Sequence, residues 1–178
     1  MLEGKKVKRT WIKGSSGSGK RTLARKLGKN LTVSVYHRDQ ISWGGKWNYR
    51  TEEEQIKLVK SFLGKDRWIF EGNRFSASFK DGRLENCDTI IYLKINRLNC
   101  LYQAVKKYSK HKNEPGEDLP RGCREEMDWT LIRYILWDFP RKENQRLKFL
   151  KQAEEMGKKV IILEGSRGIK SWCEGEEI

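Results

Sequence analysis

The sequence has few of the residues that build disulfide frameworks and zinc sites. Its four cysteines lie far apart without a C-x-x-C pair, and it contains only two histidines. We therefore expect reduced cysteines, without disulfides or a zinc site. No apolar run is long enough to cross a membrane, and the first residues lack the apolar segment of a signal peptide. These features predict a cytoplasmic protein that does not enter a membrane.

Apolar residues are also scarce. Of the 178 residues, 37% are hydrophobic and 35% are charged. The core must therefore be small and the surface densely ionic. The length suits one domain of ordinary size, and we expect a single domain over residues 1–178.

Positive charge is in excess, with a formal net charge of +14. Such a chain attracts polyanions, which include nucleotides, nucleic acid and anionic surfaces. Lysine-rich proteins also carry positive charge simply as a solvated surface. Nucleic acid is therefore a possible partner, but the charge alone does not distinguish it from other polyanions. The sequence does not indicate an oligomeric state.

Residues 14–20 read G-x-x-x-x-G-K between a predicted strand at 7–13 and a helix predicted to begin at Lys20. This order is the context of a phosphate-binding P-loop. Glycines let backbone N–H groups approach phosphate oxygens, the helix N-terminus adds partial positive charge, and Lys20 adds a full charge. The alternative is a glycine-rich turn without a ligand. The predicted nucleotide-binding residues are Gly14, Ser15, Ser16, Gly17, Ser18, Gly19, Lys20, Arg21, Thr22 and Arg167.

The motif departs from the usual pattern directly after the lysine. Arg21 replaces the Ser or Thr whose hydroxyl ligates Mg²⁺ in a P-loop, and Thr22 follows one residue later. One residue turns a helix by about 100°, so Thr22 does not simply take the same place. Thr22 is still the predicted metal ligand, with Asp39 contributing indirectly.

Acidic residues end or follow two other predicted strands. Asp39 comes soon after a strand at 32–36, and Glu71 ends a strand at 67–71. The carboxyl ends of the strands form the ligand crevice of a doubly wound α/β sheet, so both acids are placed to act there. The alternatives are a capping or turn aspartate, and a buried structural glutamate paired with arginine.

The phosphate acceptor is assigned to the same edge of the sheet. Gly72 leaves room for a ligand, and Arg74 can clamp an acceptor phosphate with two hydrogen bonds. The predicted acceptor-binding residues are Asp39, Glu71, Gly72, Asn73 and Arg74. The predicted catalytic residues are Lys20, Asp39, Arg74 and Arg141.

A helical lid is predicted over about residues 106–146. Its segment 109–122 holds two of the three prolines and almost no apolar residue, and Arg141 follows Pro140. Lid arginines can fold over transferring phosphates, although a charge-rich helix face is the alternative. After a last strand at 159–163, we expect a loop at 165–168 and a short helix at 169–172.

Three further segments make the pattern more particular: His-Arg-Asp-Gln-Ile-Ser-Trp at 37–43, Trp-Ile-Phe-Glu-Gly-Asn at 68–73 and Trp-Asp-Phe-Pro at 137–140. With the P-loop, they resemble the bacterial DNA topology modulation proteins, which look like small relatives of adenylate and shikimate kinases. The resemblance implies a parallel sheet of five strands in the order 2-3-1-4-5, flanked by helices. The Lys-Arg-Thr at 20–22 is similar to the Lys-Gly-Thr of adenylate kinases, whereas the usual Lys-Ser-Thr and a more apolar first strand are missing.

The sequence thus predicts a small-molecule kinase of the nucleoside-monophosphate-kinase type, which uses ATP and Mg²⁺ and transfers the γ-phosphoryl group to a small acceptor. The alternative is a nucleotide-binding, DNA-associated regulator, as the name of the resembling family suggests. A third reading is a nucleotide sensor that binds without turnover.

Overall fold

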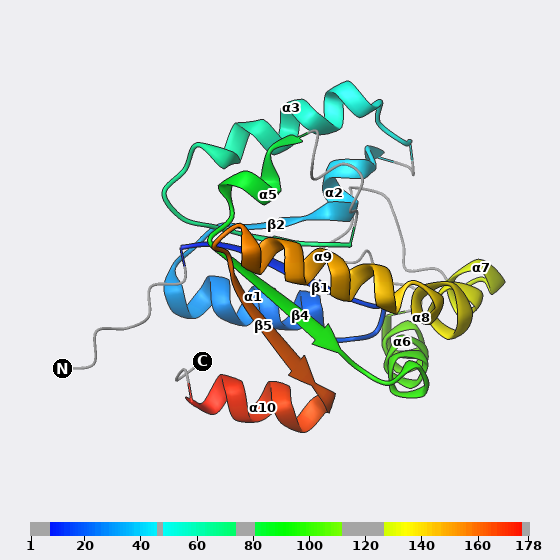
Figure 1. Ribbon diagram of the computed structural model, residues 1–178. Coiled ribbons are helices and arrows are strands. Elements are labelled where there is room, and N and C mark those ends of the chain that lie inside the picture. Colours follow the sequence, from blue (N-terminus) through cyan, green and yellow to red (C-terminus); the bar gives the residue numbers. More distant parts are fainter. Residues whose placement is uncertain (1–7, 46–47, 74–80, 112–126, 176–178) are drawn as a thin grey trace.

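The computed structural model describes residues 8–45, 48–73, 81–111 and 127–175 (Figure 1). Within these residues, five parallel strands form one open sheet in the order β2-β3-β1-β4-β5. The strands are β1 (Arg9–Gly14), β2 (Val35–His37), β3 (Trp68–Glu71), β4 (Thr89–Lys94) and β5 (Lys159–Glu164). The predicted strand order is confirmed.

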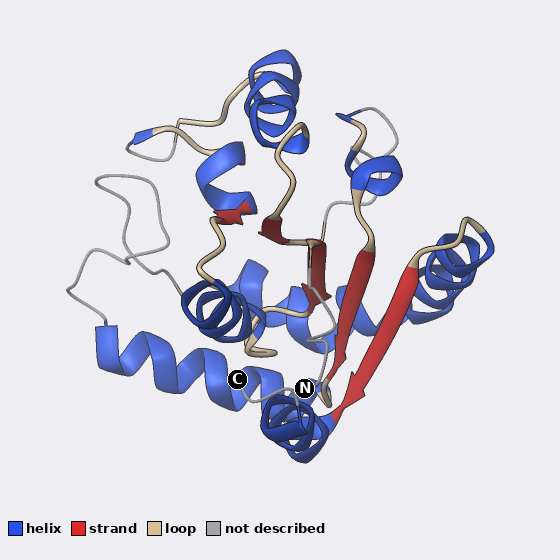
Figure 2. Ribbon diagram, turned by 90° about the vertical axis from the view of Figure 1, so that its left-hand side faces the viewer, coloured by secondary structure: helices blue, strands red, loops and turns tan. Residues whose placement is uncertain are grey.

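Helices cover both faces of this sheet (Figures 1 and 2). One face packs against α1 (Lys20–Leu31) and α10 (Gly165–Gly175), and the other packs against α3 (Glu52–Leu63), α5 (Arg83–Asn86) and α9 (Glu143–Glu155). The remaining helical segments are α2 (Arg38–Ser42), α6 (Arg97–His111), α7 (Trp129–Arg133), the π-helical turn η2 (Tyr134–Asp138) and α8 (Phe139–Arg141). Figure 1 shows α6, α7 and α8 together beyond the carboxyl ends of β4 and β1. Every described helix is too short or too polar to span a bilayer.

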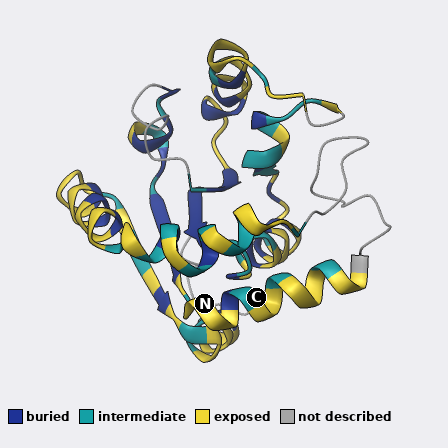
Figure 3. Cartoon of the chain, turned by 90° about the vertical axis from the view of Figure 1, so that its right-hand side faces the viewer, coloured by how far each residue is buried: buried dark blue, intermediate teal, exposed yellow. Residues whose placement is uncertain are grey.

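Alternation along β1 divides the core into two layers of different character. Trp11 packs with Phe62, Phe70 and Phe149 on one face, where aromatic rings predominate. Ile12 points to the opposite face, because successive side chains of a strand alternate, and it joins an aliphatic layer. The inner strands β1, β3 and β4 are largely buried, whereas the edge strand β5 and the outer helix faces are largely exposed (Figure 3). The low apolar content thus produces a small core and an ionic surface.

Several predicted boundaries differ from the structure. The sequence predicts a helix end at Gly28, because a glycine after an apolar helical face is a common stop, but α1 continues to Leu31 and stops at Thr32 with a left-handed φ of 53°. A Cβ at Gly28 would lie 2.4 Å from Cγ2 of Val35, so this glycine serves close packing of the helix on β2. The second strand is correspondingly short, at 35–37 instead of 32–36.

Two more corrections concern the C-terminal half. The expected loop at 165–168 is the first turn of α10, which follows β5 directly. A proline is typical of the first position of a helix, so the sequence predicts that Pro140 starts the long helix. Instead, Pro140 lies inside the short α8, and α9 begins only at Glu143. By contrast, the sequence Thr51-Glu-Glu-Glu54 predicts a capping box, which is confirmed: Oγ1 of Thr51 accepts from Glu54 N, and Oε2 of Glu54 accepts from Thr51 N.

The polar residues of β1 are accommodated inside the sheet. Lys13 is fully buried, and its Nζ lies 3.5 Å from the ring centroid of Trp11 and 4.9 Å from that of Phe149. Such cation–π contacts offset part of the cost of removing an ammonium from water. Burial nevertheless lowers the pKa of Lys13 well below its usual value, and the nearby Arg83 lowers it further.

We therefore expect Lys13→Met to stabilise the fold by about 1 to 4 kcal/mol at pH 7, as when hydrophobic residues replace other buried charges. The folded pKa lies below the unfolded one, so the destabilisation by Lys13 diminishes as pH rises toward 10.5. Urea unfolding of both proteins at pH 7 and pH 10 measures this difference. The prediction would be contradicted if Lys13→Met were less stable than the wild type, or if the difference in their free energies of unfolding were not smaller at pH 10 than at pH 7.

Candidate functional site

The glycine-rich loop, residues 14–19, joins β1 to α1. Gly17 and Gly19 have φ values of 76° and 88°, which favour glycine. A Cβ at Gly17 would lie 2.0 Å from the carbonyl oxygen of Cys100 in α6, so the loop packs too closely for a side chain there. Helix α1 begins at Lys20, directly after the loop. Its first turn therefore presents backbone N–H groups without intrahelical acceptors, together with the positive end of the helix dipole.

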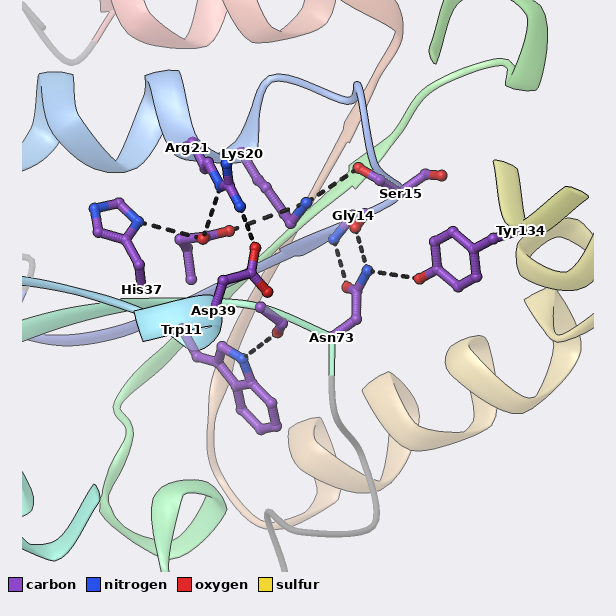
Figure 4. A network of polar contacts seen from close by, with 11 residues as sticks. Trp11, Gly14, Ser15, Lys20, Arg21, His37, Asp39, Asn73 and Tyr134 are labelled. Carbon is purple, nitrogen blue, oxygen red and sulfur yellow. Dashed lines mark hydrogen bonds and ion pairs between the residues drawn. The ribbon is translucent and has the colours of Figure 1, made fainter. Parts of the chain in front are cut away.

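Asn73 ties this loop to the end of β3. Its Oδ1 accepts from Gly14 N at 2.9 Å, while its Nδ2 donates to Gly14 O and, at 3.3 Å, to the hydroxyl of Tyr134 (Figure 4). The neighbouring Gly72 carbonyl accepts from Trp11 Nε1 at 2.8 Å. Asn73 thus positions the loop in this structure, and its predicted contact with an acceptor stays a prediction.

Register in the sheet places Glu71 at the centre of the site. Glu71 pairs with Ile12 on one side and with His37 on the other. Its carboxylate is 2% exposed, and Lys20 Nζ lies 4.0 Å from Oε2. Lys20 also donates to the carbonyl of Ser15 at 3.3 Å, so its ammonium lies between the loop and the acid.

Arg21 connects this acid with a second one. Its Nη2 donates to Oδ2 of Asp39, and its Nε lies 3.5 Å from Oε1 of Glu71. Asp39 is in the first turn of α2, directly after β2. The structure therefore brings together Lys20, Arg21, Asp39 and Glu71, which the sequence analysis had assigned to one site from three separate segments (Figure 4).

The electrostatics of Glu71 follow from these neighbours. Burial alone would raise its pKa, but the hydrogen bond with His37 and the charges of Lys20 and Arg21 lower the pKa to about 2. The ionised carboxylate accepts, so Nδ1 of His37, at 3.2 Å from Oε1, carries the hydrogen. For Lys20, burial lowers the pKa, and the negative charge of Glu71 limits that decrease.

Within the described part of the chain, the side chains predicted to hold Mg²⁺ are not arranged as a metal site. Thr22, the predicted ligand, is exposed, and Asp39 is bound to the guanidinium of Arg21. No group of three His, Cys, Asp or Glu side chains in the described ranges is arranged to hold a metal ion. The involvement of Mg²⁺ therefore stays a prediction, and these side chains give it no support.

The other predicted residues lie further out or outside the described residues. Arg141 is exposed on α8, and Arg167 is exposed in the first turn of α10. Neither is among the residues of the charged cluster formed by Lys20, Arg21, Asp39 and Glu71. Arg74 and the lid segment 112–126 lie outside the described residues. The roles of these residues stay predictions.

Two contributions were missed by sequence reasoning. A single histidine without an identified acid partner is more often structural, but His37 forms a hydrogen bond with Glu71 in the site. Its place at the end of β2 was the available signal. Tyr134, whose hydroxyl lies against Asn73, gave no signal because it comes from a distant helical segment.

The arrangement suits anion binding better than nucleophilic chemistry. Cys100, whose backbone packs against Gly17 of the loop, is buried, and burial raises the pKa of its thiol to about 11. A thiol with such a pKa stays protonated at neutral pH and is a poor nucleophile. What the site offers an incoming ligand is the N–H groups of the helix start, the ammonium of Lys20 and the guanidinium of Arg21.

Comparison of the sequence with models of known protein families and with curated proteins gives no match. The functional argument therefore depends on the geometry of this site.

The low pKa of Glu71 makes its stabilising contribution depend on pH. A carboxylate with a lowered folded pKa stabilises the protein above its unfolded pKa of 4.5, and the contribution is lost as pH falls toward about 2. We expect Glu71→Gln to lower the free energy of unfolding by about 3 kcal/mol at pH 7. This difference between the variant and the wild type should become smaller below pH 4.5.

Urea unfolding at several pH values measures this gap. Glu164→Gln, which removes a carboxylate with 67% of its side chain exposed, is the control and should change little at any pH. If Glu71→Gln destabilised the protein equally at pH 7 and pH 3, the predicted pH dependence of the contribution of Glu71 would be wrong.

Proposed function

We propose that the protein binds ATP at the glycine-rich loop, as a P-loop, and transfers its γ-phosphoryl group to a small acceptor. The observation that carries the proposal is the position of Lys20. Its ammonium lies at the start of α1, against a loop carbonyl and 4.0 Å from the buried Glu71 at the end of the neighbouring strand β3. A lysine at a helix N-terminus, next to a glycine-rich loop, is the arrangement that holds the phosphates in P-loop enzymes.

The donor phosphates would lie on the N–H groups that follow the loop glycines. These dipoles, with Lys20, oppose the negative charge that spreads over the transferred group in a loose transition state. The bond between the γ-phosphorus and the bridging oxygen breaks, ADP keeps that electron pair, and an acceptor oxygen forms the new bond. Because these donors are held before the ligand arrives, little reorganisation accompanies the transfer.

The pairing of Asp39 bears on how the acceptor reacts. Its Oδ2 accepts a charge-assisted hydrogen bond from Arg21, so this oxygen is already engaged, which favours a role in orienting groups. An acceptor that is already an anionic phosphate needs no base. A nucleoside monophosphate therefore suits this site better than a neutral alcohol does.

We expect the protein to form ADP from ATP when a nucleoside monophosphate is present, and Lys20→Ala to lower the rate about a hundredfold or more, as expected for lost charge stabilisation. The acceptor panel comprises the nucleoside monophosphates, shikimate-like acids and 5′-hydroxyl oligonucleotides.

The control is Lys29→Ala, which removes an exposed lysine from the last turn of α1 and should leave the rate unchanged. ADP formation no faster than in Lys20→Ala with every acceptor, while ATP still binds, would reject transfer and leave a nucleotide sensor.

A second candidate function, binding of single-stranded nucleic acid, is favoured by an aromatic and basic surface around α7 and η2. Trp129 and Trp137 are 67% and 40% exposed, and their ring centroids lie 6.2 Å apart. Arg133 lies exposed on the same segment, and Arg97 of α6 donates to the carbonyl of Leu136. Exposed aromatic rings among cations are what stacking on bases and contact with phosphates require.

For this candidate, we expect the double variant Trp129→Ala/Trp137→Ala to bind a fluorescent single-stranded oligonucleotide about tenfold or more weakly, since stacking contributes about 1 to 3 kcal/mol per base. The affinity of the wild type should also fall steeply with salt.

Met156→Ala, which changes an exposed apolar residue after the end of α9, is the control. Binding that is insensitive to salt, or equal in the double variant and the control, would count against a nucleic-acid surface.

A further inference from the structure

Arg21, the residue that departs from the P-loop pattern, bridges the two acids of the candidate site. Its Nη2 donates to Oδ2 of Asp39, and its Nε lies 3.5 Å from Oε1 of Glu71. The three side chains come from α1, α2 and the end of β3 (Figure 4). The guanidinium therefore stands between the two carboxylates that would otherwise face a divalent cation.

Low solvent exposure strengthens these ion pairs, and the guanidinium stays charged at physiological pH. The side chain of Arg21 is 19% exposed and that of Glu71 is 2% exposed. Water and salt screen such a pair much less than a surface pair. A guanidinium also stays protonated at any physiological pH, and its planar shape suits carboxylates and phosphates alike. Arg21 thus places a fixed positive charge beside Lys20.

The charges of the cluster balance without a metal. Lys20 and Arg21 are positive, while Asp39 and Glu71 are negative. A divalent cation would have to displace the guanidinium from the carboxylates, and the exposed Thr22 offers no replacement ligand beside them. Without the charge of Arg21, the cluster would carry one negative charge in excess, which attracts cations and repels phosphates.

We propose that Arg21 is the built-in cation of this site and that it makes nucleoside triphosphate binding independent of a divalent metal. The inference rests on the proposed nucleotide site. Arg21 holds the two carboxylates together, as a metal ion would otherwise do, and keeps their charge from opposing the phosphates. Replacing Arg21 converts the site into one that needs a divalent cation to bind the same ligand.

The test is calorimetric titration of ATP into the intact protein, once with Mg²⁺ and once with EDTA. For the wild type, the affinity for ATP should differ less than about fivefold between the two buffers, which is about 1 kcal/mol. For Arg21→Ser, the affinity in EDTA should fall about tenfold or more relative to the wild type, and Mg²⁺ should restore most of it.

Arg25→Ser is the matched control, since it removes the same charge from an exposed position one turn further along α1 and should behave as the wild type. A wild-type affinity that rises more than about fivefold with Mg²⁺ would overturn the role of Arg21 even if Arg21→Ser does not fold. Equal metal dependence of a folded Arg21→Ser and the wild type would also overturn it. Absence of ATP binding to the wild type in both buffers would instead reject the nucleotide site itself, and the inference with it.

Discussion

The constraint on which the rest of the site depends is the burial of a single carboxylate. Glu71 is 2% exposed between two other strands, and a charge in that position is tolerated only with compensating partners. Those partners are His37 from β2 and Lys20 and Arg21 from α1. The need to compensate one buried charge therefore brings the starts of two helices, and with them Asp39, to the same end of the sheet.

The backbone of the glycine-rich loop is held by a separate set of contacts. Asn73 binds both polar backbone groups of Gly14, and Gly17 lies against the backbone of α6. The loop is thus attached to β3 at one end and packed on α6 in the middle, independently of the charges around Glu71. A preformed loop of this kind presents its N–H groups without a reorganisation cost, which is the condition for strong binding of an anion.

The sequence was sufficient to predict the strand order, the capping box at Thr51 and the convergence of Lys20, Asp39 and Glu71, because strong apolar runs, a local cap motif and the resemblance specified them. It was not sufficient for the end of α1, since a glycine at position 28 signals a helix stop and close packing equally well. Nor was it sufficient for the contacts of Arg21 and His37, because their partners are distant in the chain and no periodicity marks such pairs.

Arg21 shows why a departure from a motif has to be judged in three dimensions. On the sequence alone, an arginine after the loop lysine is a missing hydroxyl ligand, and the natural conclusion is a weakened metal site. In the fold, the same side chain reaches two acids that the motif does not contain and, together with Lys20, balances their charge. Arg21 and the acids therefore form one unit, because a partly buried arginine without Glu71 and Asp39, or those acids without Arg21, would leave charge uncompensated. For the proposed phosphate ligand, the relevant quantity is the charge of the whole cluster, which Arg21 and Lys20 together balance without metal coordination.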